Sequence, residues 1–137
     1  MAAAWHPRYQ TYLHVEHWAN ALNQGPAAAR NMLGVPTPYA RLPYFYPDQY
    51  DLSMEYSGFA ADWDRVVVRG DLAAREFIAF WLKDQRVVAG MNAGVFDVVE
   101  PIQALIRGGR PVDPARLADP DLPLDQVTGE LATTSAQ

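Results

Sequence analysis

The stretch "REFIAFWLKDQRVVAGMNAGV", residues 75–95, decides the fold that the sequence predicts. Two apolar runs of strand length flank the short polar segment Lys83-Asp84-Gln85, and this arrangement predicts a tight hairpin turn. Both runs are rich in the β-branched and aromatic residues that are enriched in strands. We therefore predict two neighbouring antiparallel strands here.

Further strands are predicted upstream of this hairpin. "DRVVVRGD", residues 64–71, is a β-branched run that closes at Gly70-Asp71. "YFYPDQYDLSMEYSG", residues 44–58, holds a short aromatic strand, after which Leu52, Met54 and Tyr56 alternate with polar residues. Because short connections join these strands, we expect an antiparallel meander of four to five strands.

Helical patterns follow the strands. In "FDVVEPIQALIRGG", residues 96–109, Asp97 is the expected N-cap, Gly108-Gly109 is the expected end, and four apolar residues share one face: Val98, Ile102, Leu105 and Ile106. "VDPARLAD", residues 112–119, predicts a short helix with Asp113 as N-cap and Pro114 at its first position. The predicted fold class is therefore α+β, a meander with two C-terminal helices.

A separate helical pattern covers Val15–Leu33 and includes "EHWANALNQG", residues 16–25. Gly25-Pro26 predicts either a kink or the start of a second helix, and Gly34 is a suitable C-terminal residue. Residues 1–14 show no clear period and predict a loop or extended segment. "VPTPYARLP", residues 35–43, has three prolines and predicts a linker at a domain boundary.

Composition limits the classes of function. The formal charge of −5 and the pI of about 5.0 argue against a nucleic-acid partner. The absence of cysteine excludes disulfides, cysteine-bound metals and thiol catalysis in this chain. Neither an apolar run long enough for a membrane span nor a secretory start is present, so we expect a cytoplasmic chain without a membrane partner.

Few residues suggest catalysis. His14 and His17 flank Glu16, but no third metal ligand shares that face. Ser53, Ser57 and Ser135 lack a nucleophile-elbow context, the carboxylates fall at turns and strand faces, and no Gly-rich phosphate loop occurs. We therefore predict no catalytic residue and no metal site.

Aromatic and polar residues are more informative. If Phe45 faces the core, Tyr44 and Tyr46 share the opposite face, either as a platform for a flat ring or as packing beneath the N-terminal helix. Glu16, His17 and Trp18 stand at the start of that helix, where unpaired backbone N–H groups and the helix dipole favour negative charge. This helix start suits a bound ligand or a neighbouring domain.

Several blocks together resemble one family. "EHWANALNQG", "LPYFYPDQYDL", "VVRGD", "FIAFWL" and "RVVAGMN" follow one another in an order and spacing similar to the C-terminal part of FAD-dependent ferredoxin reductases of the putidaredoxin reductase type. The resemblance covers nearly all of residues 5–127. It implies an FAD-domain remnant at 1–34, a reductase C-terminal α+β domain at 35–127, and a disordered tail at 128–137.

The resemblance also implies a cofactor and partners. By motif match, Glu16, His17 and Trp18 would lie at the pyrimidine edge of the FAD isoalloxazine, with Tyr44 and Tyr46 close to the flavin. The intact reductase would pass electrons from NAD(P)H through FAD to a ferredoxin. This chain would shield the flavin, help to dock the ferredoxin or mediate dimerisation.

Departures from the family pattern qualify this expectation. Both Gly-rich nucleotide loops and the flavin-binding Gly-Asp pair are absent, and Tyr46-Pro47 stands where many relatives have Trp-Ser. We therefore expect a fragment that needs the FAD and NAD(P)H domains of a parent enzyme and holds neither nucleotide alone. Two alternatives are a stand-alone homodimerisation module and a small-molecule-binding domain, which would need a concave site between the meander and its helices.

Overall fold

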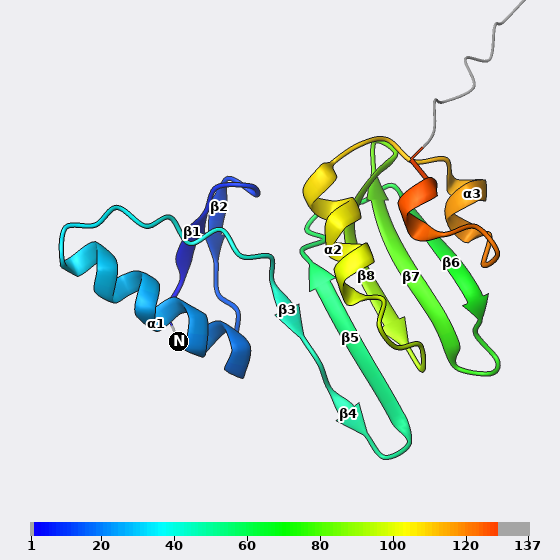
Figure 1. The fold of residues 1–137 in the computed structure, drawn as a ribbon, viewed down its shortest axis with the longest axis horizontal. Helices are drawn as coiled ribbons and strands as arrows, with labels where there is room; N and C mark the ends of the chain where they lie inside the picture. The colour runs from blue at the N-terminus through cyan, green and yellow to red at the C-terminus, as the bar shows by residue number, and fades with distance from the viewer. Residues whose placement is uncertain (1, 129–137) are drawn as a thin grey trace, which may run out of the picture. The chain divides into compact units, whose positions relative to one another are not determined.

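The computed structural model describes residues 2–128, and the chain divides into two compact units, Met1–Phe45 and Tyr46–Gln137 (Figure 1). This division lies later in the chain than the predicted boundary after residue 34. Apart from Thr128, the predicted tail at 128–137 falls outside the described residues.

The first unit opens with a small hairpin, where a loop or extended segment was expected. Strands β1 (Ala4–His6) and β2 (Thr11–Leu13) pair antiparallel, with Trp5 opposite Tyr12. These two rings meet edge to face with centroids 5.4 Å apart. Such a cross-strand aromatic pair stabilises a hairpin, and it explains why this aperiodic segment forms strands.

Helix α1 (Trp18–Met32) is continuous and contains Pro26, so of the two alternatives at Gly25-Pro26 the start of a second helix is excluded. Pro26 removes one backbone hydrogen bond from the helix. Asn23 and Asn31 add side-chain hydrogen bonds to Ala19 O (2.6 Å) and Ala27 O (2.8 Å) along the same helix.

Gly34 ends α1 as predicted. It adopts a left-handed φ of 79°, its N–H bonds to Asn31 O, and the N–H of Val35 bonds to Arg30 O. This pair of bonds is the Schellman arrangement that favours glycine. The following segment 35–43 then returns along the first unit, since Tyr39 bonds to Asn20 and Arg41 O lies 3.0 Å from His6 Nε2. Strand β3 (Tyr44–Phe45) ends the unit.

The second unit is built on an antiparallel sheet. Its strands are β4 (Asp48–Gln49), β5 (Leu52–Gly58), β6 (Arg65–Asp71), β7 (Glu76–Lys83) and β8 (Arg86–Ala93). The predicted hairpin turn between β7 and β8 is confirmed, with left-handed backbone at Asp84 and Gln85. Left-handed residues match the twist of a two-residue hairpin.

The strand order differs from a simple meander. Strands β6, β7 and β8 pair in sequence, but β5 pairs with β8, and the order is β5-β8-β7-β6. Gly58 makes the pairing of β5 with β8 possible, because its φ is 95° and a Cβ at this position would lie 2.4 Å from Val88 O. The chain therefore carries β5 to the far side of β8, although the predicted α+β class is confirmed.

Helices α2 (Val99–Gly108) and α3 (Pro114–Ala118) and the 3-10 turn η1 (Leu124–Gln126) follow the sheet. Figure 1 shows α2 and α3 in front of the same face of the sheet. Asp113 caps α3 as predicted, accepting from Ala115 N at 2.8 Å. The prediction for Asp97 is wrong: Val98 is the N-cap, because Asp97 turns the chain with a φ of 60° one residue earlier.

The core lies between this face of the sheet and the helices. Its largest fully buried side chains are Phe80, Leu82, Ile102, Ile106, Val112, Leu117 and Val127. Gly90 admits α2 to the sheet, because a Cβ there would lie only 2.5 Å from Ile102 Cγ2. A single missing side chain on β8 thus sets the depth at which α2 packs.

The other face of the sheet is also apolar. The pairing register places Val66, Trp81, Tyr56 and Met91 on this second face. Tyr56 and Trp81 lie with ring centroids 5.6 Å apart, and Val66 is 46% exposed. A sheet with one solvated face normally places polar residues there, so this pattern is typical of a sheet that is covered on both faces.

Candidate functional site

The N-terminus of α1 carries three of the predicted site residues. His17 is the N-cap, with extended backbone (φ −139°, ψ 147°), and its Nδ1 accepts a hydrogen bond from Ala19 N at 3.3 Å. Trp18 is the first helical residue and is 65% exposed. No acidic residue lies in the first turn, so the positive end of the helix dipole is uncompensated within that turn.

Tyr39 and Asn20 hold this helix start in place. The Tyr39 hydroxyl donates to Asn20 Oδ1 at 2.8 Å, while Asn20 Nδ2 donates to Val15 O at 2.9 Å. Burial raises the pKa of the Tyr39 phenol, and the charge of Arg41 partly opposes this rise. Sequence reasoning missed both residues because their contact joins the helix to the proline-rich segment.

Tyr44, in β3, lies beside His17 in space. Their ring centroids lie 6.4 Å apart at an interplanar angle of 83°. The fold therefore brings a residue of β3 beside the helix start. Tyr46 belongs to the second unit and is 42% exposed, and Phe45 is 40% exposed rather than facing a core.

Glu16 is exposed, and its carboxylate lies 3.5 Å from His14 Nε2. Among residues 2–128, no three His, Asp or Glu side chains gather as a set that could hold a metal ion. An exposed pair of this kind contributes little to stability. Glu16 thus supplies negative charge immediately before the capped turn.

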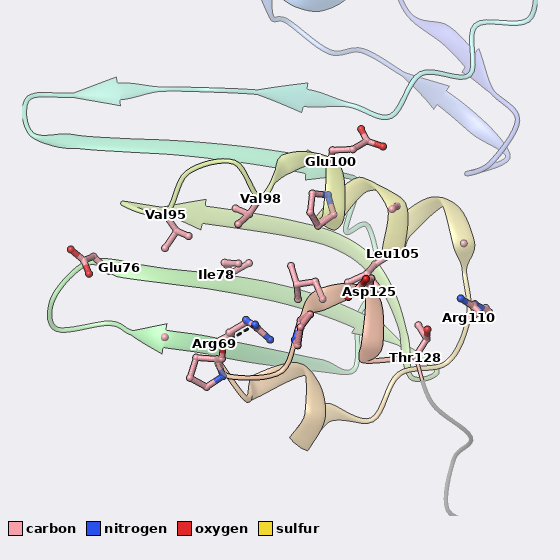
Figure 2. A pocket seen from close by; sticks show the side chains of 17 residues that line it. Arg69, Glu76, Ile78, Val95, Val98, Glu100, Leu105, Arg110, Asp125 and Thr128 are labelled. Carbon is pink, nitrogen blue, oxygen red and sulfur yellow. Dashed lines mark hydrogen bonds between the residues drawn. The ribbon is translucent and has the colours of Figure 1, made fainter.

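A concave site lies in the second unit, where α2 and η1 meet the sheet. This α2–η1 groove has a volume of about 860 Å³, and its apolar lining includes Ile78, Val95, Val98, Leu105, Pro123 and Leu124. Figure 2 shows Ile78 on the sheet between Val98 on one side and Arg69 on the other. It is the concave site between meander and helices that a small-molecule domain requires.

Arg69 ties one wall of the groove to the sheet. From β6 its guanidinium donates to the carbonyl oxygens of Leu122 (2.7 Å), Pro120 (3.1 Å) and Leu117 (3.4 Å). These bonds hold the segment between α3 and η1 in place. The "VVRGD" run gave no sign of this role, because the three acceptors are backbone atoms about fifty residues further along the chain.

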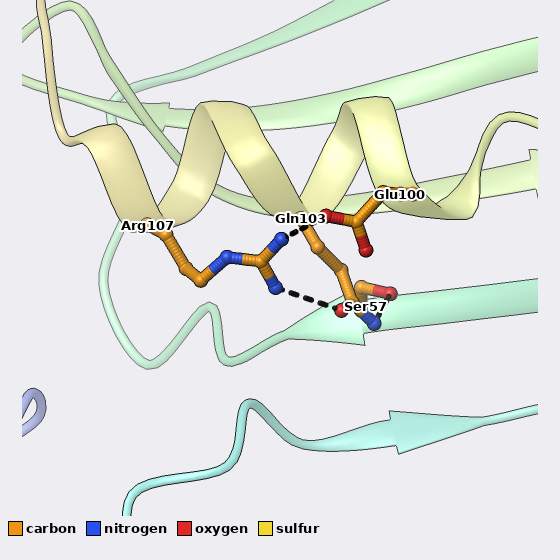
Figure 3. A network of polar contacts seen from close by, with 4 residues as sticks. All are labelled: Ser57, Glu100, Gln103 and Arg107. Atoms are coloured by element: carbon orange, nitrogen blue, oxygen red, sulfur yellow. Dashed lines mark hydrogen bonds and ion pairs between the residues drawn. The ribbon is translucent and has the colours of Figure 1, made fainter.

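A polar network anchors α2 from its other side (Figure 3). Gln103 Nε2 donates to Ser57 Oγ at 3.2 Å, Arg107 Nη1 donates to Gln103 Oε1 at 3.1 Å, and Arg107 pairs with Glu100. Ser57 is buried beneath this network. Its side chain accepts from an amide rather than contacting a general base, so the geometry gives Ser57 a structural role.

A buried amide, Asn92, fixes the turn that precedes α2. Asn92 on β8 donates to Glu55 Oε2 at 2.9 Å and to Val95 O at 2.8 Å. Asn92 is itself buried, and a buried amide needs such partners. The contact joins β8, β5 and the loop to α2, and so positions the rim of the α2–η1 groove.

The reductase C-terminal family matches residues 44–128, and the chain belongs to this family. Its relatives are ferredoxin reductases of the putidaredoxin reductase type, so the resemblance in the sequence is confirmed.

Two curated relatives illustrate the match. The ferredoxin reductase subunit of 5,5'-dehydrodivanillate O-demethylase from Sphingobium is 40% identical over 115 residues, which is 83% of this chain and 28% of that protein. Putidaredoxin reductase of Pseudomonas putida is 31% identical over 124 residues, 87% of this chain and 28% of that protein. The chain thus spans less than a third of these relatives.

A solved structure agrees. The covalent putidaredoxin reductase–putidaredoxin complex matches with a TM-score of 0.77 and 28% identity, over 93% of this chain and 32% of that one. Between residues 2 and 128, no helix is both long enough and apolar enough to cross a bilayer.

Proposed function

We propose that this chain acts as the C-terminal module of a flavoprotein that passes electrons from NAD(P)H through FAD to a ferredoxin. The observation that carries the proposal is the 40% identity to a ferredoxin reductase subunit over 83% of the chain. This similarity covers more of the chain than the family match, which is limited to residues 44–128. The solved relative bound to putidaredoxin supports a ferredoxin as partner.

In this proposal the helix start of α1 faces the flavin edge. His17 caps the turn, Trp18 is exposed beside it, and Tyr44 lies against His17. FAD, when bound, supplies the redox chemistry by accepting a hydride and releasing single electrons. The N-terminal dipole of α1 stabilises negative charge on the ring, the neighbouring Glu16 carboxylate opposes it, and the aromatic side chains exclude water from the ring.

The same residues do not fit the rest of FAD. The sequence contains no Gly-rich loop that would cradle a pyrophosphate. Tyr46 follows Tyr44 by two residues, so the backbone keeps their Cα atoms within about 7 Å of each other. Both tyrosines can therefore belong to one site at the flavin edge. We therefore assign Glu16, His17, Trp18, Tyr44 and Tyr46 to shielding of the flavin edge, and the binding of the dinucleotide to other domains.

A second candidate, homodimerisation, rests on the second face of the sheet. Val66 is exposed there and pairs across the strands with the half-buried Trp81, while the half-buried Met91 lies on the same face; apolar side chains gathered on an open sheet face can serve as an interaction site. Sedimentation velocity over a hundredfold range of concentration tests this candidate. A dimer that Trp81→Lys dissociates would support it, and a monomer at every concentration would exclude it.

A chimera tests the main proposal. Residues 2–137 replace the matching C-terminal segment of putidaredoxin reductase, and FAD content and NADH-dependent reduction of putidaredoxin are measured. We expect a yellow, active chimera, whereas the isolated chain should retain no stoichiometric FAD after gel filtration. A folded but colourless chimera, or tight FAD binding by the isolated chain, would contradict the proposal.

A further inference from the structure

We propose that the α2–η1 groove is a binding site for a small carboxylic acid with an apolar ring body, with Arg69 as the anchor for its carboxylate. The groove lies in the second unit and shares no residue with the proposed flavin edge. The inference therefore goes beyond the electron-transfer role, and either proposal can fail without the other.

The size and lining of the groove fit a drug-sized apolar molecule. Its volume of about 860 Å³ falls within the range of about 300–1,000 Å³ that is usual for ligand pockets. Ile78, Leu105 and Leu124 form a buried apolar floor. Val95 and Val98 are half-buried at one edge. Such a surface favours aromatic or alicyclic rings.

The charges in the groove indicate the head group. Arg69 is the only partly buried charge of the lining, since Glu76, Glu100, Arg110 and Asp125 are all exposed. Glu100 is already paired with Arg107. A charge that is partly removed from water interacts more strongly with a ligand than an exposed one, so Arg69 dominates the selectivity for charge.

Arg69 also has donors left for a ligand. Its three hydrogen bonds go to carbonyl oxygens through Nη1 and Nη2, while a guanidinium has five N–H donors. Within residues 2–128, the Arg69 Nε–H makes no hydrogen bond and no carboxylate pairs with the guanidinium. Neutral carbonyls leave its charge in place, and a carboxylate is the head group that a guanidinium binds best.

Two probes of equal shape test the inference. The full chain is titrated with biphenyl-4-carboxylate and with biphenyl-4-carboxamide, and amide shifts are followed by NMR. We expect shifts at Ile78, Val98 and Leu105 with both probes, and about tenfold tighter binding of the carboxylate, because a hydrogen bond to a charged group is the stronger one. Equal affinities, or shifts confined to other residues, would overturn the proposal.

Variants locate the site. Ala104→Trp, at an exposed position of α2 in the groove lining, should abolish binding of both probes. Ala115→Trp, exposed on α3 outside the lining, should leave both affinities unchanged. Arg69→Met, which also loosens the α3–η1 wall of the groove, should abolish the preference for the carboxylate over the carboxamide, whatever affinity for the carboxamide is left. Retention of full carboxylate affinity in Ala104→Trp or Arg69→Met would also overturn the proposal.

Discussion

The Tyr39 hydroxyl donates a 2.8 Å hydrogen bond to Asn20 Oδ1, and this bond ties the proline-rich segment to the start of α1. Tyr39→Phe should therefore lower the free energy of unfolding of the first unit by about 1 kcal/mol, the usual net value of such a bond. Urea denaturation checks this. Tyr50→Phe, at a fully exposed tyrosine, is the control and should be neutral.

Gly90→Ala should destabilise the second unit. The added Cβ would lie 2.5 Å from Ile102 Cγ2, so α2 must move away from the sheet, at a cost of about 1–3 kcal/mol. Gly108→Ala is the matched control, because nothing lies within 4 Å of its added Cβ. Thermal melts of the two variants should separate clearly, and equal melting temperatures would refute this account of the packing.

Arg69→Met should release the segment that joins α3 to η1. The variant loses three hydrogen bonds to Leu117, Pro120 and Leu122, and we expect a loss of about 1.5–3 kcal/mol. Faster hydrogen exchange at the amide of Leu122, which bonds to Asp119 O, would locate the effect. Arg65→Met changes an exposed arginine on the same strand and should leave this exchange rate unchanged.

Stability should fall as the pH rises through about 10. Burial raises the pKa of Tyr56, although a backbone hydrogen bond to Ala60 partly opposes the rise, and a hydrogen bond to Asp62 raises the pKa of Lys83. Both groups hold their protons more tightly in the folded state than in the unfolded state. Their contributions are complete below the unfolded pKa values and disappear as the pH passes the folded ones.

Tyr56→Phe isolates the tyrosine part of this pH effect. Between pH 8 and 11, the urea midpoint of the variant should fall less steeply than that of the natural chain. Tyr50→Phe serves again as the exposed control and should follow the natural chain. A slope for Tyr56→Phe identical to that of the natural chain would exclude the phenol as a contributor.

Glu16→Gln should raise the midpoint potential of the flavin in the chimera with putidaredoxin reductase. Removal of a negative charge beside the helix start stabilises the reduced, negatively charged ring, by about 20–50 mV for a charge several ångströms away. Spectroscopic titration with a reference dye measures this potential. The control is Asp51→Asn, which removes an exposed carboxylate of the second unit that pairs with Arg75. An equal shift of the midpoint potential in both variants would contradict the placement of Glu16 at the flavin edge.

The hairpin, the short capped helix and the glycine-ended helices could be predicted because each depends on neighbouring residues. Asp113 and Gly34 act on atoms a few residues away, and their signals are local. The position of β5 beside β8 could not be predicted, since it depends on the close approach of Gly58 to Val88. Nor could the role of Arg69, whose partners are distant carbonyls.

In the candidate site, too, features set by neighbouring residues could be predicted, and contacts between distant residues could not. The residues Glu16, His17 and Trp18 were found from the helix pattern and the family resemblance, while the contact of His17 with Tyr44 required the fold. The assignment of these residues to a flavin remains a prediction. The α2–η1 groove was anticipated only as a requirement of one alternative, because its walls come from four separate segments.

The order of the strands has a kinetic consequence. Val67 pairs with Phe80 and Trp81 with Ala89 across short loops, whereas Tyr56 must find Met91 across the whole of β6 and β7. Local contacts form fast, and contacts that close long loops form slowly. Strand β5 is synthesised before β6, β7 and β8, so its apolar residues stay unpaired until β8 has been made. During this interval the nascent chain is most prone to misfolding and aggregation.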